Sequence, residues 1–261
     1  MTPFATPLDR EALRAMYPER DGKPMSDNTK QGRWIHILYG NLCALLADRA
    51  DAFVASDNLW YPVEGKPEER QAPDVYVAFG RPKGDRGSYM QWLEDDVPIT
   101  VAFEILSPGN TREEMVAKFD FYDHHGVEEY YIYDPDRNKL QIYTRGKATL
   151  RLHRDIANFR SPRLGIRCEM TKPEMTVSAP DGTRFRTFEE LKREADEAKR
   201  RADDNARRAD DNARRADDNA RRADDNARRA DRITELSRKA RRGQATADEL
   251  AELDRFLDAP P

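Results

Sequence analysis

The sequence predicts an α+β domain with a mixed β-sheet, followed by a long helical tail of heptad repeats. The first observation is the order of periodic segments in the first 188 residues, which read as helix, three strands, helix and further strands. The second is the distribution of the aromatic residues, because 22 of the 23 lie in that part and can form its core. The third is the heptapeptide RADDNAR, which occurs four times without change between Arg201 and Arg228.

Charge separates the two parts of the chain. Residues 189–261 hold 19 Lys or Arg and 20 Asp or Glu, so 39 of these 73 residues are charged, against 55 of the first 188. We therefore expect a loose lead-in over residues 1–25, a folded domain over 26–188, a charged helix over 189–242 and a short helix over 243–261.

Composition argues against several classes of protein. The longest apolar run, Leu42–Ala47, is far too short to cross a membrane and no signal segment is evident, so we expect a soluble, cytoplasmic protein. Cys43 and Cys168 lack the spacing of a metal site or a disulfide framework, so we expect two reduced, packed thiols. The first 188 residues have a net charge of −3, which provides no overall electrostatic footprint for nucleic acid.

The first predicted helix begins at Ser26 or Asp27, which are good N-cap residues, and ends near Asp48. Its apolar residues recur at helical spacing from Trp34 to Leu46. Three strands separated by turn signals are expected next, over residues 53–63, 73–79 and 99–106. A turn-rich loop at 80–98 precedes the last of them. The last of these, ITVAFEIL, is the most apolar β-type run in the chain and should form a central strand.

A second helix is predicted from Thr111 to His125, because Thr111 and Glu114 form a capping box and Gly126 supplies a left-handed stop. The segments after this helix are rich in aromatic and β-branched residues, and we expect strands at 129–133, 140–144 and 149–153. Two later segments are expected to wrap over the sheet: 159–168 and 175–188.

The alanines of the tail alternate steps of four and three residues from Ala202 to Ala230, which is the seam spacing of a coiled coil. Asp203 with Arg207, and their equivalents in later heptads, supply favourable i,i+4 pairs. Because alanine buries little area, the pairing energy per heptad is small. Two interpretations therefore stay open: a solvated single helix that acts as a spacer, and a homo-oligomer or another complex formed through residues 189–242.

Two carboxylates lie in the most apolar part of the predicted sheet. Asp74 opens the second predicted strand, and Glu104 lies near the end of the third. If these strands pair antiparallel with Phe79 opposite Ile99, Asp74 lies opposite Glu104, since both pairs of residue numbers sum to 178. Adjacent carboxylates repel each other unless a cation or a shared proton lies between them, and oxygen ligands are those that Mg²⁺ and Mn²⁺ prefer.

Lys118 lies in the middle of the second predicted helix, on the stripe of Met115 and Tyr122 that should face the sheet. Its ammonium group would then reach the edge where Asp74 and Glu104 converge. Two metal-binding carboxylates and a lysine suit phosphodiester hydrolysis, in which the metal activates a water and the lysine orients it or stabilises the transition state. The alternative from spacing alone is a structural ion pair between a buried carboxylate and the lysine.

These residues lie within a set of ordered motifs: APDVYVAFG (72–80), VAFEILSPGNT (101–111), Lys118, FYDHHGVEEYYIYDP (121–135) and SPRLGIR (161–167). Over about residues 26–170 the chain resembles the Uma-type restriction endonuclease family of bacteria, a branch of the PD-(D/E)XK nuclease superfamily. The resemblance implies a restriction-endonuclease-like core, with a mixed sheet flanked by helices. It also implies a Mg²⁺- or Mn²⁺-dependent endonuclease that hydrolyses DNA.

The resemblance assigns roles to four residues. Asp74, which follows a proline, and Glu104 match the two acids of the superfamily motif, and are the implied metal ligands. The position two residues after the second acid, normally lysine, is Leu106 here. In this family the lysine has moved to the following helix, where Lys118 is the matching position. Tyr122, one turn later, resembles a tyrosine that other branches of the superfamily carry on this helix.

Other polar residues have simpler interpretations. His124 and His125 stand at a helix end, where the helix dipole favours them, and His36 is expected at the surface or in packing. Asp57 and Glu64 could supply a further metal ligand, although a role unrelated to metal is the simpler interpretation. The basic clusters at 81–86 and 145–151 flank loops and would serve either phosphate contact or solubility.

A function of a different class remains open beside the nuclease. In this alternative, a catalytically silent nuclease fold acts as an interaction or oligomerisation module and displays its C-terminal helix to a partner.

Overall fold

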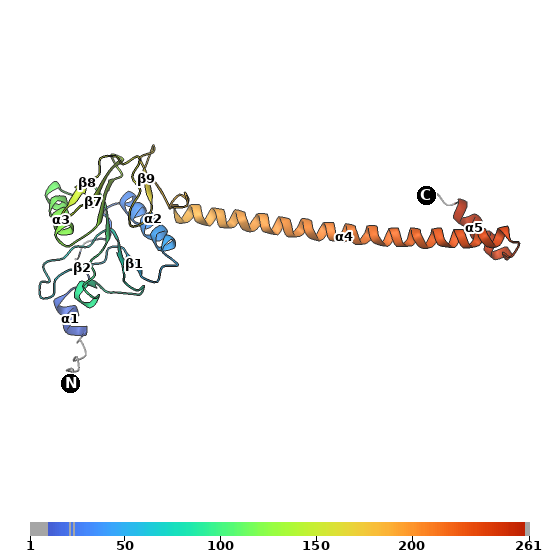
Figure 1. The fold of residues 1–261 in the computed structure, drawn as a ribbon, viewed down its shortest axis with the longest axis horizontal. Helices are drawn as coiled ribbons and strands as arrows, with labels where there is room; N and C mark the ends of the chain where they lie inside the picture. The colour runs from blue at the N-terminus through green and yellow to red at the C-terminus, as the bar shows by residue number, and fades with distance from the viewer. Residues whose placement is uncertain (1–9, 21, 23, 259–261) are drawn as a thin grey trace, which may run out of the picture. The chain divides into compact units, whose positions relative to one another are not determined.

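Six strands form a mixed β-sheet in the order β1-β3-β5-β6-β7-β8 (Figure 1). Strands β5 and β6 pair in parallel, and the other neighbouring strands pair antiparallel. The strands are β1 (Ala52–Ala55), β3 (Val75–Phe79), β5 (Val101–Ile105), β6 (Glu129–Asp134), β7 (Lys139–Arg145) and β8 (Leu150–Leu152). The computed structural model describes residues 10–20, 22 and 24–258, and the chain divides into two units after Leu191. The α+β class and the mixed sheet predicted from the sequence are confirmed.

Helices α2 (Thr29–Leu45) and α3 (Arg112–His124) cover opposite faces of this sheet (Figure 1). Side chains alternate along β5, so that Val101, Phe103 and Ile105 pack in the cluster formed with α2, whereas Ala102 packs with residues of α3. Glu104 therefore lies on the face of the sheet that α3 covers. The sequence pattern predicts that Lys118 of α3 points toward this face.

The helix boundaries follow from local capping. Thr111 Oγ1 accepts a hydrogen bond from Glu114 N at the start of α3, as the predicted capping box requires. Gly126 has a φ of +89° just beyond the end of α3, a conformation that side-chain-bearing residues rarely adopt. At α2 the sequence prediction is wrong by one or two residues, because Asn28 rather than Ser26 or Asp27 is the N-cap and accepts from Gln31 N.

Short elements replace some of the expected strands and loops. The predicted strand over 53–63 is split into β1 and β2 (Trp60–Tyr61), with Asp57 at a φ of +48° between them. Strand β2 pairs in parallel with β4 (Tyr89–Met90), which together with the 3₁₀ helix η1 (Gln91–Leu93) lies in the segment expected to be a loop. Strands β9 (Arg167–Glu169) and β10 (Thr176–Ser178) pair antiparallel in the segment expected to wrap over the sheet.

Part of the expected N-terminal lead-in is structured. Residues Arg10–Met16 form helix α1, and Tyr17 directly after it is buried against Leu59 and Tyr61. The Tyr17 hydroxyl accepts a hydrogen bond from Gly65 N over 2.7 Å, so the ring is packed and its polar end has a hydrogen-bond partner. Residues 1–9, 21 and 23 of the same expected segment lie outside the described part of the chain.

The buried carboxylate of Glu129 holds the segment after β8 against the sheet. It accepts hydrogen bonds from Tyr131 OH, Ser161 Oγ and Arg163 N at 2.6 to 2.7 Å, and burial raises its pKa. Glu129→Ala is expected to lower the free energy of unfolding by about 3 kcal/mol, because it leaves the buried hydroxyl groups of Tyr131 and Ser161, and the amide of Arg163, without their acceptor. Urea denaturation measures this, with the neighbouring exposed Glu128→Ala as the control; an equal loss in both variants would contradict the assigned role.

The second unit begins at Lys192 and contains most of helix α4 (Phe188–Arg241) and all of helix α5 (Ala247–Asp258). Helix α4 spans 54 residues, and residues 191–228 within it are all exposed. The predicted i,i+4 pairing occurs, for example between Asp224 and Arg228 at 2.8 Å. Helix α5 packs on the end of α4, where Lys239 Nζ lies 2.7 Å from Glu249 Oε1. The long C-terminal helix predicted from the repeats is confirmed, and among the described residues no helix is long and apolar enough to span a membrane.

Candidate active site

The pairing of β3 with β5 determines where the two predicted acids lie. Val75 is opposite Phe103 and Val77 is opposite Val101, so paired residue numbers sum to 178, the register that the sequence predicts. Asp74 directly precedes β3 and continues this register toward Glu104. Asp74 Oδ2 accepts a hydrogen bond of 2.6 Å from Ile105 N, next to Glu104 on β5. The two carboxylates therefore lie at the same end of this strand pair, where β3 begins and β5 ends.

Helix α3 supplies both partners of Glu104. Lys118 Nζ donates to Glu104 Oε2 over 2.7 Å, and Tyr122 OH donates to Glu104 Oε1 over 2.6 Å. The two helix residues are four positions apart and so project from the same side of α3. Glu104 is 3% exposed and the Lys118 side chain is 13% exposed, so this is a buried ion pair with directed hydrogen bonds.

Burial and neighbouring charge set the protonation of these groups. Burial, and then the charge of Glu104, raise the pKa of Asp74 to about 8. Burial by itself would lower the pKa of Lys118, but the carboxylates of Glu104 and Asp74 raise it above its ordinary value. Burial and the Glu104 charge raise the pKa of Tyr122 far above its ordinary value. At neutral pH and without a metal ion, the site therefore presents the Lys118 ammonium group, the Tyr122 phenol as a donor, and an Asp74 carboxyl group that holds its proton.

A cavity of about 360 Å³ opens beside these residues. Asp74 and Lys118 line it, and so do Asp57 and Glu114, whereas Glu104 is not part of its lining. The charge of Asp57 adds to the rise in the pKa of Asp74, which places Asp57 near the site, although the sequence favoured a role unrelated to metal for it. The remaining lining residues come from the start of α2 and the two flanking loops: Pro24, Met25, Ser26, Asp27, Gln31, Gln71, Ala72, Gly109 and Asn110.

Gln31 is a residue of this region that the sequence analysis did not single out. Its side chain is buried, donates to the carbonyl oxygen of Ile105 over 2.9 Å and accepts from Asp27 N over 2.7 Å. It thereby attaches the start of α2 to the end of β5. The available signal was a polar residue on the apolar stripe of α2, one turn before Ile35 and in line with Leu38.

The other sequence candidates lie in different surroundings. His36 is exposed and its Nδ1 hydrogen-bonds with the carbonyl of Gly32 in its own helix. Glu64 is exposed and does not line the cavity. Neither residue is brought to the Asp74 cavity.

The two basic clusters support loops. Arg81 and Arg86 both bind the carboxylate of Glu94, with side chains that are 13% and 12% exposed. Arg145 donates to the backbone carbonyl of Val127 over 2.8 Å. These guanidinium groups are engaged within the domain, which makes them poor candidates for phosphate contact.

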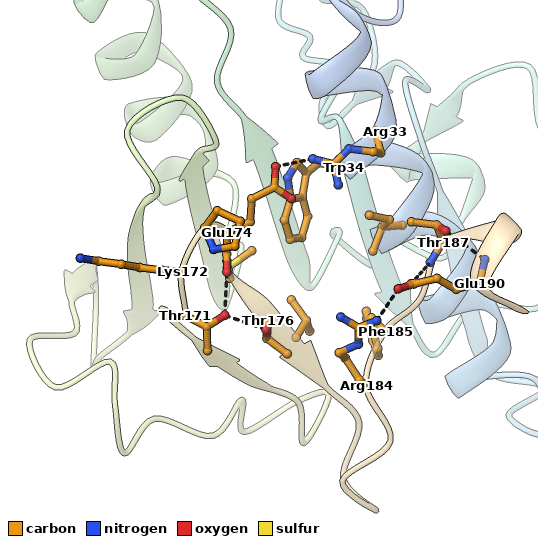
Figure 2. A pocket seen from close by; sticks show the side chains of 14 residues that line it. Arg33, Trp34, Thr171, Lys172, Glu174, Thr176, Arg184, Phe185, Thr187 and Glu190 are labelled. Atoms are coloured by element: carbon orange, nitrogen blue, oxygen red, sulfur yellow. Dashed lines mark hydrogen bonds and ion pairs between the residues drawn. The ribbon is translucent and has the colours of Figure 1, made fainter.

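A second cavity, of about 290 Å³, lies between α2 and the β9–β10 hairpin (Figure 2). Figure 2 shows Arg33 paired with Glu174 and Arg184 paired with Glu190 at this cavity. It shares no lining residue with the cavity beside Asp74. Since its arginines are already neutralised, the Asp74 cavity is the stronger candidate for chemistry.

The donor set beside the first cavity fits a divalent cation. Asp74 and Glu104 offer oxygen atoms only, which is the preference of Mg²⁺ and Mn²⁺. Burial, and then the charge of Glu104, raise the pKa of Asp74, so its protonated form is favoured when no cation lies beside it. A cation at the cavity would supply the missing positive charge and keep Asp74 ionised.

Comparison with known proteins identifies the family. A family model named Uma2 and described as "Putative restriction endonuclease" matches residues 12–201. A solved structure described as "a putative nuclease belonging to DUF820 from Anabaena variabilis" is 14% identical, and the match covers 55% of this chain and 77% of the other, with a TM-score of 0.41. No curated protein matches the chain. Because the family model spans well over half of the sequence, the chain belongs to the Uma2 family.

Proposed function

We propose that this chain is a Mg²⁺- or Mn²⁺-dependent endonuclease that hydrolyses the phosphodiester bonds of DNA. The observation that carries the proposal is the buried Glu104, held between Lys118 and Tyr122 and in register with Asp74 at the edge of a cavity. Membership of a family described as restriction endonucleases supports the same reaction class.

Asp74 and Glu104 would hold the metal ion. When bound, the ion would lower the pKa of a water molecule and neutralise charge on the phosphate. Tyr122 donates a hydrogen bond to Glu104 Oε1 and so holds the carboxylate in one orientation. The phenol keeps its proton at any working pH because its pKa is raised far above the ordinary value.

Lys118 would provide the second positive charge of the reaction. Its ammonium group lines the cavity and stays protonated, so it can donate to the attacking water or to a phosphate oxygen as negative charge develops. Leu106, at the position where related nucleases have their lysine, has no group that could do this. The role therefore falls on the lysine of α3.

Supercoiled plasmid incubated with the purified protein and Mg²⁺ or Mn²⁺ tests the proposal. Wild type is expected to nick the plasmid and Glu104→Ala is expected to lose this activity, because the substitution removes a metal ligand and the partner of Lys118. Glu113→Gln, an exposed carboxylate on the same helix, is the matched control and should keep full activity. Equal nicking by wild type and Glu104→Ala would point to a contaminating nuclease and reject the proposal.

We also propose that α4 associates with a second copy of the chain through its alanine seam. The supporting observation is that the seam alanines are exposed along the helix from Ala202 to Ala227. Light scattering of the full chain should give the mass of two or more chains, and Ala209→Lys with Ala216→Lys should give the mass of one. Lysines at Asp211 and Asp218, on another side of the helix, serve as the control. A monomeric wild type would instead support the spacer interpretation.

A further inference from the structure

A group of metal-ligating side chains lies at the far end of α3 from Lys118. Among the described residues, Glu69, His124 and His125 form the one group of three His, Cys, Asp or Glu side chains whose ligand atoms lie within 4.8 Å of one another. His125 Nε2 is 3.0 Å from Glu69 Oε1, and the two imidazole rings are 4.7 Å apart and nearly perpendicular. None of the three lines the cavity beside Asp74.

The surroundings fix two of the three donors. The His125 ring contacts the rings of Trp60 and Phe121, with centroids 5.8 and 4.5 Å away, and its side chain is 9% exposed. Lys66 Nζ lies 3.1 Å from Glu69 Oε2, which leaves Oε1 turned toward His125. His124 is exposed and can rotate toward them.

We propose that Glu69, His124 and His125 bind a Zn²⁺ ion. Two imidazoles and one carboxylate form a ligand set that suits zinc and leaves a fourth position for water, whereas Mg²⁺ prefers oxygen ligands alone. Zinc bonds of about 2.0 to 2.2 Å require donor atoms about 3.4 Å apart in a tetrahedron. The three ligand atoms lie within 4.8 Å of one another, so a rotation of the exposed His124 side chain can complete the site.

The helix end favours a cation at this place. His124 is the last residue of α3 and His125 is its C-cap, so both imidazoles lie at the end of the helix where its dipole presents partial negative charge. That charge offsets part of the repulsion from Lys66. The alternative is a simple hydrogen bond between His125 and Glu69. That alternative would not require His124 to lie close to both of them.

The ion would connect two segments that also carry the candidate active site. Glu69 lies five residues before Asp74 in the same connection to β3, and His124 follows Lys118 and Tyr122 on α3. Zinc would therefore hold the Asp74 segment and α3 together from the side away from the cavity. This role is independent of whether the protein cleaves DNA.

Titration of the metal-free full chain with Co²⁺ tests the site, because four-coordinate Co²⁺ has intense visible absorption bands and six-coordinate Co²⁺ has weak ones. Wild type is expected to develop intense bands at one equivalent, which Zn²⁺ removes by displacement. Glu69→Gln, His124→Ala and His125→Ala are each expected to lose the bands. His36→Ala, which changes an exposed histidine of α2, is expected to keep them.

Thermal unfolding gives a second readout. Zn²⁺ at 100 times its Kd should raise the Tm of wild type by about 5 °C or more and leave that of His124→Ala unchanged. Because His124 is exposed, this variant is expected to retain its fold, which circular dichroism verifies. Weak bands in wild type or intense bands in His124→Ala would overturn the proposal.

Discussion

Asp74→Asn is expected to stabilise the metal-free protein above about pH 4 and to abolish DNA cleavage. Burial and the charge of Glu104 raise the pKa of Asp74 from 3.8 to about 8, so the folded state keeps a proton that the unfolded state has already released. The free energy of unfolding of wild type should therefore fall as the pH rises from about 4 to about 8. The steepest slope from this one group is about 1.4 kcal/mol per pH unit.

Urea denaturation of both proteins in EDTA, at several pH values between 4 and 9, measures this difference. Asparagine retains an oxygen for the hydrogen bond from Ile105 N but has no proton to lose in this range. The stability advantage of the variant should grow with pH and level off above about pH 8. Parallel stability curves for the two proteins would contradict the raised pKa of Asp74 in the folded state.

Lys118→Met is expected to reduce both stability and cleavage. The substitution retains the length of the side chain but leaves the Glu104 carboxylate, which is 3% exposed, without its cation. Loss of one partner of a buried pair costs about 3 to 5 kcal/mol of the free energy of unfolding. Cleavage in Mg²⁺ should fall by about 10²- to 10⁴-fold, because the group that donates to the water or the phosphate is absent.

Urea denaturation and plasmid cleavage separate the two effects when both are measured at a temperature where the variant is folded. Lys147→Ala, an exposed lysine in the turn between β7 and β8, is the control and should change neither quantity appreciably. A Lys118→Met protein that is destabilised and yet cleaves at the wild-type rate would assign Lys118 to structure alone.

Features set by local or periodic patterns could be predicted from the sequence. The apolar runs placed β3 and β5, and the register between them followed from arithmetic on Asp74 and Glu104. Thr111 and Glu114 marked the start of α3, and helical periodicity placed Lys118 on the face that meets Glu104. The roles in catalysis assigned to these residues through the family resemblance stay predictions.

Features that depend on contacts between distant segments could not be predicted. Gln31 supports the end of β5 across 74 positions, and no local pattern connects it with Ile105. The arginines near residue 81 read as candidate phosphate contacts because their partner, Glu94, is recognisable only once the intervening loop is folded. For the same reason His124 and His125 read as helix-end residues, since Glu69 approaches them from a different segment.

Mn²⁺ binding, measured from the electron paramagnetic resonance signal of the free ion, tests the central claim most directly. Wild type is expected to bind Mn²⁺ through Asp74 and Glu104, and Asp74→Asn should bind at least about tenfold more weakly because the ion loses one of two charged oxygen ligands. His124→Ala should bind Mn²⁺ as wild type does, since that site offers mainly nitrogen ligands. Equal Mn²⁺ affinity in wild type and Asp74→Asn would contradict a metal-dependent nuclease centred on this pair of acids.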